Sequence, residues 1–125
     1  MDTRSKIITA EAALALTKPL VVVTGYFDVL RAEHARELEA IRRRNPDGPL
    51  LAVVLCFAGE VLDIQARARM VAALRVVDYV VAAPEPDADA LLEALHARTI
   101  VRMEADDARR NREIAELIRR RLRDQ

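Results

Sequence analysis

The repeated alternation of a short apolar run with a longer helical stretch is the feature that most constrains this fold. Three runs of mainly apolar residues, at 20–24, 50–56 and 78–82, are separated by segments with helical spacing. Such runs are typical of parallel strands covered on both faces, because a half-exposed strand alternates apolar with polar residues. Strands that alternate with helices predict right-handed crossovers and a single α/β domain over residues 1–125.

Turn and capping signals place the remaining elements. The cluster Asn45-Pro46-Asp47-Gly48-Pro49 predicts a turn before the second strand. A short fourth strand is expected at 99–103, and helices are expected at 9–17, 32–44, 65–75, 87–97 and 106–123. The predicted fold class is therefore α/β, a Rossmann-like parallel sheet of about four to five strands with helices on both faces.

Composition excludes several classes of function. The chain has 20 basic and 20 acidic residues, so no overall field draws it to nucleic acid or to an anionic membrane. It has no apolar stretch of membrane-spanning length, and its first residues lack the apolar core of a signal peptide. Cys56 is its one cysteine, which excludes an internal disulfide and predicts a buried thiol in a reducing compartment. We expect a soluble, cytoplasmic protein.

The last helical stretch carries an apolar stripe and many arginines. Ile114, Leu117, Ile118 and Leu122 share one face at helical spacing. We expect this stripe to pack on the sheet and the arginines to face solvent, with a contact to a second subunit as a further role. Nucleic acid is not an expected partner, because acidic residues dilute the charge and no aromatic residue accompanies it.

Residues 21–34, VVVTGYFDVLRAEH, combine a strand, a glycine turn and the start of a helix. In open α/β sheets ligands bind beyond the carboxyl ends of the strands, where the strand order reverses. A helix amino terminus at that position favours a phosphate, because its backbone N–H groups and its dipole point at the ligand. The turn at 24–31 is therefore the position predicted for a site.

This stretch resembles the G-x-F-D-x-x-H-x-G-H signature of the nucleotidyltransferase (cytidylyltransferase-like) superfamily. It is most similar to the adenylyltransferase domain of ADP-heptose synthase and to glycerol-3-phosphate cytidylyltransferase. A second block at 67–81, RARMVAALRVVDYVV, resembles the family's arginine, leucine-rich helix and L-R-x-V-D-Y-V segment. With the opening Lys6-Ile7-Ile8, the likeness spans about residues 6–105.

The resemblance implies a nucleotide site built on this turn. In the family, two histidines donate hydrogen bonds to the charge that develops at the attacked α-phosphate. The second corresponds to His34, whereas Arg31 stands in place of the first and Glu33 in place of the intervening glycine. The resemblance thus assigns catalysis to His34 and Arg31, and nucleotide or phosphate binding to Thr24, Gly25, Tyr26, Phe27, Asp28 and Arg67. No protein-bound metal is expected apart from Mg²⁺, which is expected only if the protein is active.

Three departures from the family pattern argue against a complete catalyst. Arg31 binds phosphate well but is longer than histidine, and a misplacement of about 1 Å can cost on the order of a hundredfold in rate. Glu33 adds a negative charge beside the phosphates. Residues 102–107, RMEADD, stand where relatives carry a K-G-G-D-Y-like segment, and no Ser/Thr-rich helix start follows to hold a triphosphate.

We therefore expect a family member that binds a nucleotide, CTP or ATP, or a phosphate, with weak or no nucleotidyl transfer. One alternative is an active enzyme that moves CMP or AMP to a sugar- or polyol-phosphate and releases pyrophosphate. Another is a non-catalytic interaction or oligomerisation module, and the resemblance also implies a homodimer.

Individual residues have simpler interpretations that stay open at this point. His34 also fits a partly exposed helix position, and Asp28 fits a cap of the turn before the helix. Arg67 fits a solvated helix face. His96 lies near the end of a predicted helix, where a cation suits the dipole, so we assign it no ligand role. A structural metal site is not expected, because no Cys, His and carboxylate cluster has ligand spacing.

Overall fold

The computed structural model describes residues 2–27, 32–56, 63–83 and 87–124, and their side chains except at 87, 106–111 and 114. The element order alternates helices and strands, as the sequence predicts. The elements are η1 (Thr3–Lys6), α1 (Ala10–Leu14), β1 (Val21–Gly25), α2 (Ala32–Arg44), β2 (Leu50–Leu55), α3 (Ile64–Ala72), β3 (Tyr79–Ala83), α4 (Asp87–Leu95), β4 (Thr99–Arg102) and α5 (Met103–Arg123).

The four strands form one parallel sheet in the order β3-β2-β1-β4. β1 pairs with β2 from Val21 opposite Leu50, and it pairs with β4 from Val21 opposite Thr99. The predicted α/β class is confirmed. Because β2 and β3 lie on one side of β1 and β4 lies on the other, the strand order reverses between β1 and β4.

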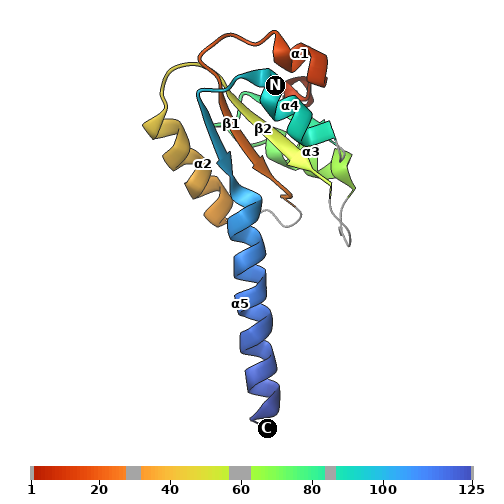
Figure 1. The fold of residues 1–125 in the computed structure, drawn as a ribbon, viewed down its shortest axis with the longest axis vertical. Coiled ribbons are helices and arrows are strands. Elements are labelled where there is room, and N and C mark those ends of the chain that lie inside the picture. Colours follow the sequence, from red (N-terminus) through yellow and green to blue (C-terminus); the bar gives the residue numbers. More distant parts are fainter. Residues whose placement is uncertain (1, 28–31, 57–62, 84–86, 125) are drawn as a thin grey trace.

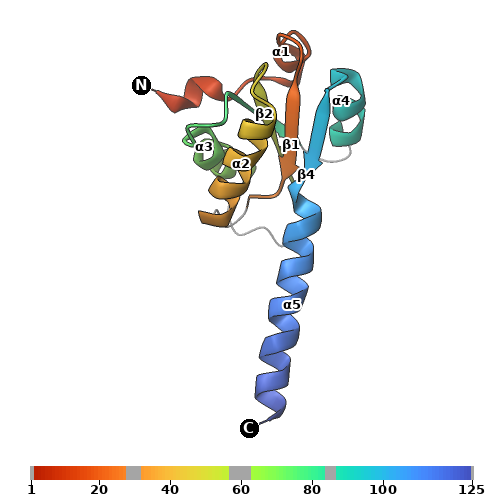
Figure 2. The same ribbon diagram turned by 90° about the vertical axis from the view of Figure 1, so that its left-hand side faces the viewer.

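Helices cover both faces of the sheet (Figures 1 and 2). On one face the odd-numbered residues of β1 pack with α2 and α3, and on the other Val22 packs with α1 and α4. This alternation is the two-residue period of a strand, applied to residues that are apolar on both faces. All five residues of β1 are buried, which explains the unbroken apolar run.

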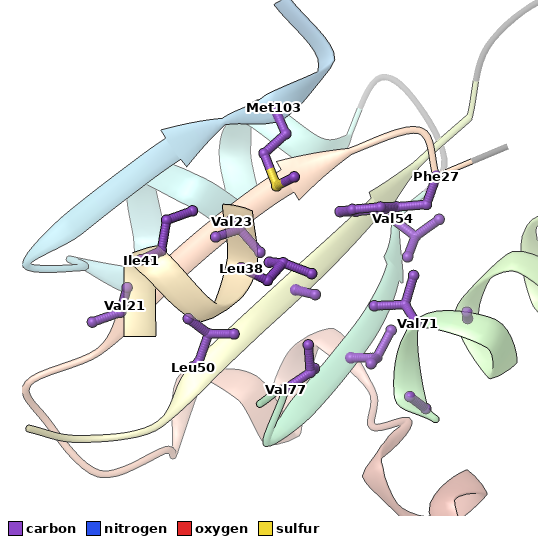
Figure 3. Close-up of a cluster of buried hydrophobic side chains, with 14 residues drawn as sticks. Val21, Val23, Phe27, Leu38, Ile41, Leu50, Val54, Val71, Val77 and Met103 are labelled. Carbon is purple, nitrogen blue, oxygen red and sulfur yellow. The ribbon is translucent and has the colours of Figure 1, made fainter. Parts of the chain in front are cut away.

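The larger cluster of buried side chains lies between the sheet and the helices α2 and α3 (Figure 3). Leu38 and Ile41 supply the apolar stripe of α2, and Val71 faces the sheet from α3. Phe27 and Met103 lie at the end of the cluster that belongs to the carboxyl edge of β1. That edge is therefore anchored in the core from two separate segments.

The turn at 45–49 requires its glycine. Gly48 has φ +80°, and a Cβ built on it would lie 1.8 Å from the backbone oxygen of Pro19. No L side chain fits that conformation and that space without moving the backbone. The sequence cluster therefore marks a point where two chain segments cross closely.

Several boundaries differ from the predicted ones. α1 and α3 end earlier than expected because their last turns tighten: Leu16 donates to the carbonyl of Ala13, and Leu74 donates to that of Val71. η1 was not predicted, since it carries no apolar pattern. Cys56 is partly exposed and not buried as expected, because β2 ends one residue before it.

The largest difference concerns α5. The sequence predicts a helix packed on the sheet, but both views show α5 leaving the domain and projecting away from it (Figures 1 and 2). It begins directly after β4, at Met103 and not at 106, because Met103 is buried in the core. Leu117, Ile118 and Leu122 are exposed. The prediction was wrong because an apolar stripe looks the same in the sequence whether it packs on its own domain or lies exposed on a projecting helix.

None of the described helices combines the length and the apolar character that crossing a bilayer requires.

Candidate functional site

The candidate site lies at the carboxyl ends of β1 and β4, where the strand order reverses. Thr24 in β1 is the register partner of Arg102 in β4. The chain continues from Thr24 into Gly25, Tyr26 and Phe27, and from Arg102 into the first turn of α5. The structure thus places the predicted turn residues beside residues 102–104. From the sequence, this segment was notable only because it lacks the family's K-G-G-D-Y-like motif.

A partly buried hydrogen bond joins the two strand ends. Thr24 is buried, and its Oγ1 donates to Oε2 of Glu104 at 2.6 Å. The Glu104 side chain is only 14% exposed, and its Oε1 lies 3.8 Å from Nη1 of Arg102. A short bond to a charged acceptor is among the stronger hydrogen bonds in proteins. Glu104 therefore holds the start of α5 against β1.

A cavity of about 300 Å³ opens beside this bond. It is lined by Tyr26, Leu55, Ala88, Asp89, Leu92, Arg102 and Glu104. One wall is apolar and comes from β2 and α4, whereas the charged wall comes from α4, β4 and α5. Arg102 Nη1 lies 3.9 Å from Oδ1 of Asp89, so one guanidinium stands between two carboxylates.

Gly25 and Phe27 are shaped by one close contact. Phe27 has φ 52°, in the left-handed region, and its ring is buried. A Cβ added at Gly25 would lie 2.8 Å from ring carbons of Phe27. A residue with φ > 0 that is not glycine is uncommon, and such strain often occurs at functional sites. Gly25 thus leaves room for the Phe27 ring, and the buried ring holds the backbone of the turn in place.

His34 is buried under this turn and not partly exposed. Its ring lies edge-on to Phe27, with centroids 6.0 Å apart and an interplanar angle of 64°. Glu33 beside it is exposed in the first turn of α2, where a carboxylate is favourable for the helix dipole. The catalytic role of His34 stays a prediction, and its ring is placed on the α2 side of the sheet.

Arg67 is fully buried, which excludes the solvated helix face. Its Nη1 donates to the carbonyl oxygens of Tyr26 and Leu55, at 2.6 Å each. One guanidinium therefore ties the end of β1 to the end of β2 directly beneath the candidate site. Its predicted contact with a phosphate stays untested, and no sequence signal indicates this structural role.

Two predicted residues, Arg31 and Asp28, lie outside the described residues, as does most of the loop at 57–63. The predicted site residues that the structure describes are therefore Thr24, Gly25, Tyr26, Phe27, His34 and Arg67. Of these, Thr24 and Tyr26 face the side of the cavity, and Phe27 and His34 lie on the opposite face of the sheet.

A larger hollow, of about 880 Å³, lies at the other end of the strands. Its polar groups already serve the fold: Arg42 donates to the carbonyl of Gly48, and Asp78 accepts from the backbone N–H of Leu50. Size alone therefore does not make it the better candidate, because the fold places ligands at the carboxyl ends.

Among the described side chains, no three of the types His, Cys, Asp and Glu gather as metal ligands. No family model and no curated protein matches the chain.

Proposed function

We propose that this chain is a nucleotide- or phosphate-binding member of the nucleotidyltransferase superfamily in which nucleotidyl transfer is weak or lost. One observation carries the proposal: the cavity beside Tyr26 and Arg102 coincides with the reversal of strand order between β1 and β4. The turn that resembles the family signature ends at this same edge. The position that the topology favours for a ligand and the position of the family-like turn in the sequence therefore coincide.

The charges in the cavity support the loss of transfer. Nucleotidyl transfer depends on positive groups placed around the phosphate, because charge develops there in the transition state. Here Arg102 lies within 4 Å of both Glu104 and Asp89, at 3.8 and 3.9 Å. The carboxylate of Glu104 is held in place by Thr24. Among the described residues that line the cavity, a triphosphate would therefore meet two carboxylates, Glu104 and Asp89, and one guanidinium, Arg102.

Mg²⁺ usually reaches such sites with the nucleotide and is held by one or two carboxylates as well as phosphates. The described carboxylates at this edge, Glu104 and Asp89, are both engaged by Arg102. They do not form a ready pair of metal ligands.

The proposal is tested by a thermal-shift titration with CTP, ATP, GTP and UTP, each with and without Mg²⁺. A ligand that binds only the folded state raises Tm by mass action. We expect a small, saturable shift with at least one nucleotide. We expect no pyrophosphate release when sugar- or polyol-phosphates are added. Release of pyrophosphate would establish the active alternative, and the absence of any shift at millimolar nucleotide would reject nucleotide binding.

A variant in which an uncharged amide replaces a carboxylate tests whether the nucleotide binds in the cavity. Glu104→Gln keeps an acceptor for Thr24 and removes a negative charge. We expect nucleotide affinity to rise roughly five- to tenfold, as for the loss of one repulsion in a site of intermediate dielectric. Glu93→Gln is the matched control, because Glu93 is exposed on α4 and does not line the cavity. Equal affinities of the two variants would place the ligand elsewhere.

A second candidate function is an oligomerisation module. It is favoured by α5, which projects from the domain while Leu117, Ile118 and Leu122 remain 49–65% exposed. Sedimentation of the full chain as an oligomer, with no effect of any nucleotide on Tm, would support this function over the first.

A further inference from the structure

The projecting part of α5 carries two adjacent rows of side chains. Glu113, Leu117 and Arg121 follow one another at intervals of four residues, and side chains at that spacing are neighbours on a helix. Ile118 and Leu122 form the next row, one position further along. Leu117 is 49% exposed and Ile118 is 53% exposed, so an apolar surface flanked by opposite charges faces solvent.

The charges on α5 fall into two groups. In the first group, Glu116 lies 3.0 Å from Arg119, 3.8 Å from Arg120 and 3.6 Å from Arg123. Glu113 and Arg121 have no ion pair with any residue that the structure describes. They also cannot reach each other, because eight residues of helix separate them by about 12 Å. These two charges, which have no ion pair among the described side chains, therefore lie beside the exposed apolar residues.

We propose that α5 pairs with α5 of a second copy of this chain, antiparallel and centred on Leu117. In that arrangement Glu113 of one copy faces Arg121 of the other, and Leu117 faces Leu117. The row is therefore complementary to itself, which is the requirement for a two-fold interface. Ile118 lies beside Leu117, so it comes close to Ile118 of the other copy, whereas Leu122 lies further from the two-fold axis.

The charge order favours the antiparallel orientation. In a parallel pair in register, Glu113 would face Glu113 and Arg121 would face Arg121, and both contacts repel. The macrodipoles of two antiparallel helices also oppose each other favourably. The pairing specifies the oligomerisation function and does not depend on nucleotide binding.

The length of the contact sets its strength. The overlap around Leu117 covers only a few turns, and stable interfaces bury at least about 1,000 Å². We therefore expect a weak dimer that forms and dissociates with protein concentration. Such a pair also stabilises a projecting helix whose described anchors, Met103 and Glu104, lie in its first turn, since isolated helices of this length are marginal in water.

The test is sedimentation equilibrium of the full chain over a range of concentrations. We expect a monomer–dimer equilibrium. Arg121→Glu and Glu113→Arg are each expected to raise the dimer dissociation constant by about tenfold or more, because each places like charges together. The double variant, Glu113→Arg with Arg121→Glu, restores the opposition in an antiparallel pair and is expected to recover the affinity of the natural chain.

Arg119→Glu is the matched control, because it makes the same change of net charge and Arg119, two residues after Leu117, lies on the opposite side of α5. We expect it to leave the dissociation constant within about twofold. Far-UV circular dichroism confirms that each variant keeps its helix. A monomer at every attainable concentration would overturn the proposal. So would single variants without effect, or a double variant weaker than both, and these two results would leave an oligomerisation function by another surface intact.

Discussion

Arg67 and the arginines at the end of α5 carry the same guanidinium in opposite surroundings. Arg67 is fully buried and bonds two backbone carbonyls at the carboxyl edge of the sheet. Arg119, Arg120 and Arg123 are exposed and share the carboxylate of Glu116. A group withdrawn from water must be satisfied by the protein, whereas an exposed group exchanges one partner for water at little cost. The contribution of an arginine to stability therefore depends on its burial and on its partners and not on residue type alone.

The largest loss of stability is expected on replacing Arg67. Arg67→Met keeps much of the volume but leaves the carbonyls of Tyr26 and Leu55 without this donor. We expect the free energy of unfolding in urea to fall by about 2–5 kcal/mol, since each unsatisfied buried group costs about 1–3 kcal/mol. Arg69→Met, exposed on the same helix, is expected to change it by less than about 0.5 kcal/mol. Similar losses for both variants would contradict the structural role of Arg67.

An intermediate effect is expected at Thr24. Thr24→Val preserves the shape and removes the hydrogen bond to Glu104, a largely buried carboxylate. We expect a loss of about 1–3 kcal/mol in the same urea measurement, as for a hydrogen bond to a charged group. Thr99→Val is the control, because its hydroxyl makes only a long contact of 3.4 Å with Asn45. If Thr24→Val is as harmless as Thr99→Val, the bond to Glu104 does not form in solution.

The smallest effect is expected at Glu116. Glu116→Gln removes the shared partner of three exposed arginines, each pair contributing at most about 0.5 kcal/mol. We expect little change in the urea midpoint and a small loss of helical signal by far-UV circular dichroism, which added salt abolishes. A large loss of stability would show that this side of α5 is covered in solution and would break the comparison.

Most of the sheet could be predicted from sequence because its residues are buried on both faces. The runs at 20–24 and 50–56 contain little polarity, so they leave few alternatives to a covered parallel strand. The bounds of α2 agree with the expected 32–44, because the turn cluster ends it sharply. The same alternation predicts parallel strands, but it does not give their order, β3-β2-β1-β4, or the direction in which α5 leaves the sheet.

The candidate site was harder to predict because its contacts join distant segments. Thr24 and Glu104 are 80 positions apart, and nothing in either local sequence indicates that they meet. The burial of Arg67 likewise depends on the ends of two strands. Pattern reasoning locates the turn at 24–31 through topology, but it cannot tell which side chains occupy the space around it.

The absence of a loop between β4 and α5 has a mechanical consequence. Arg102 ends the strand and Met103 begins the helix, so the direction of α5 is set by the backbone of β4. A helix of 21 residues is about 30 Å long, so a tilt of about 10° at its base displaces its tip by about 5 Å. The helix is a lever arm whose fulcrum is the bond between Thr24 and Glu104. Distances measured from labels near Arg123 would therefore magnify small rearrangements at the cavity.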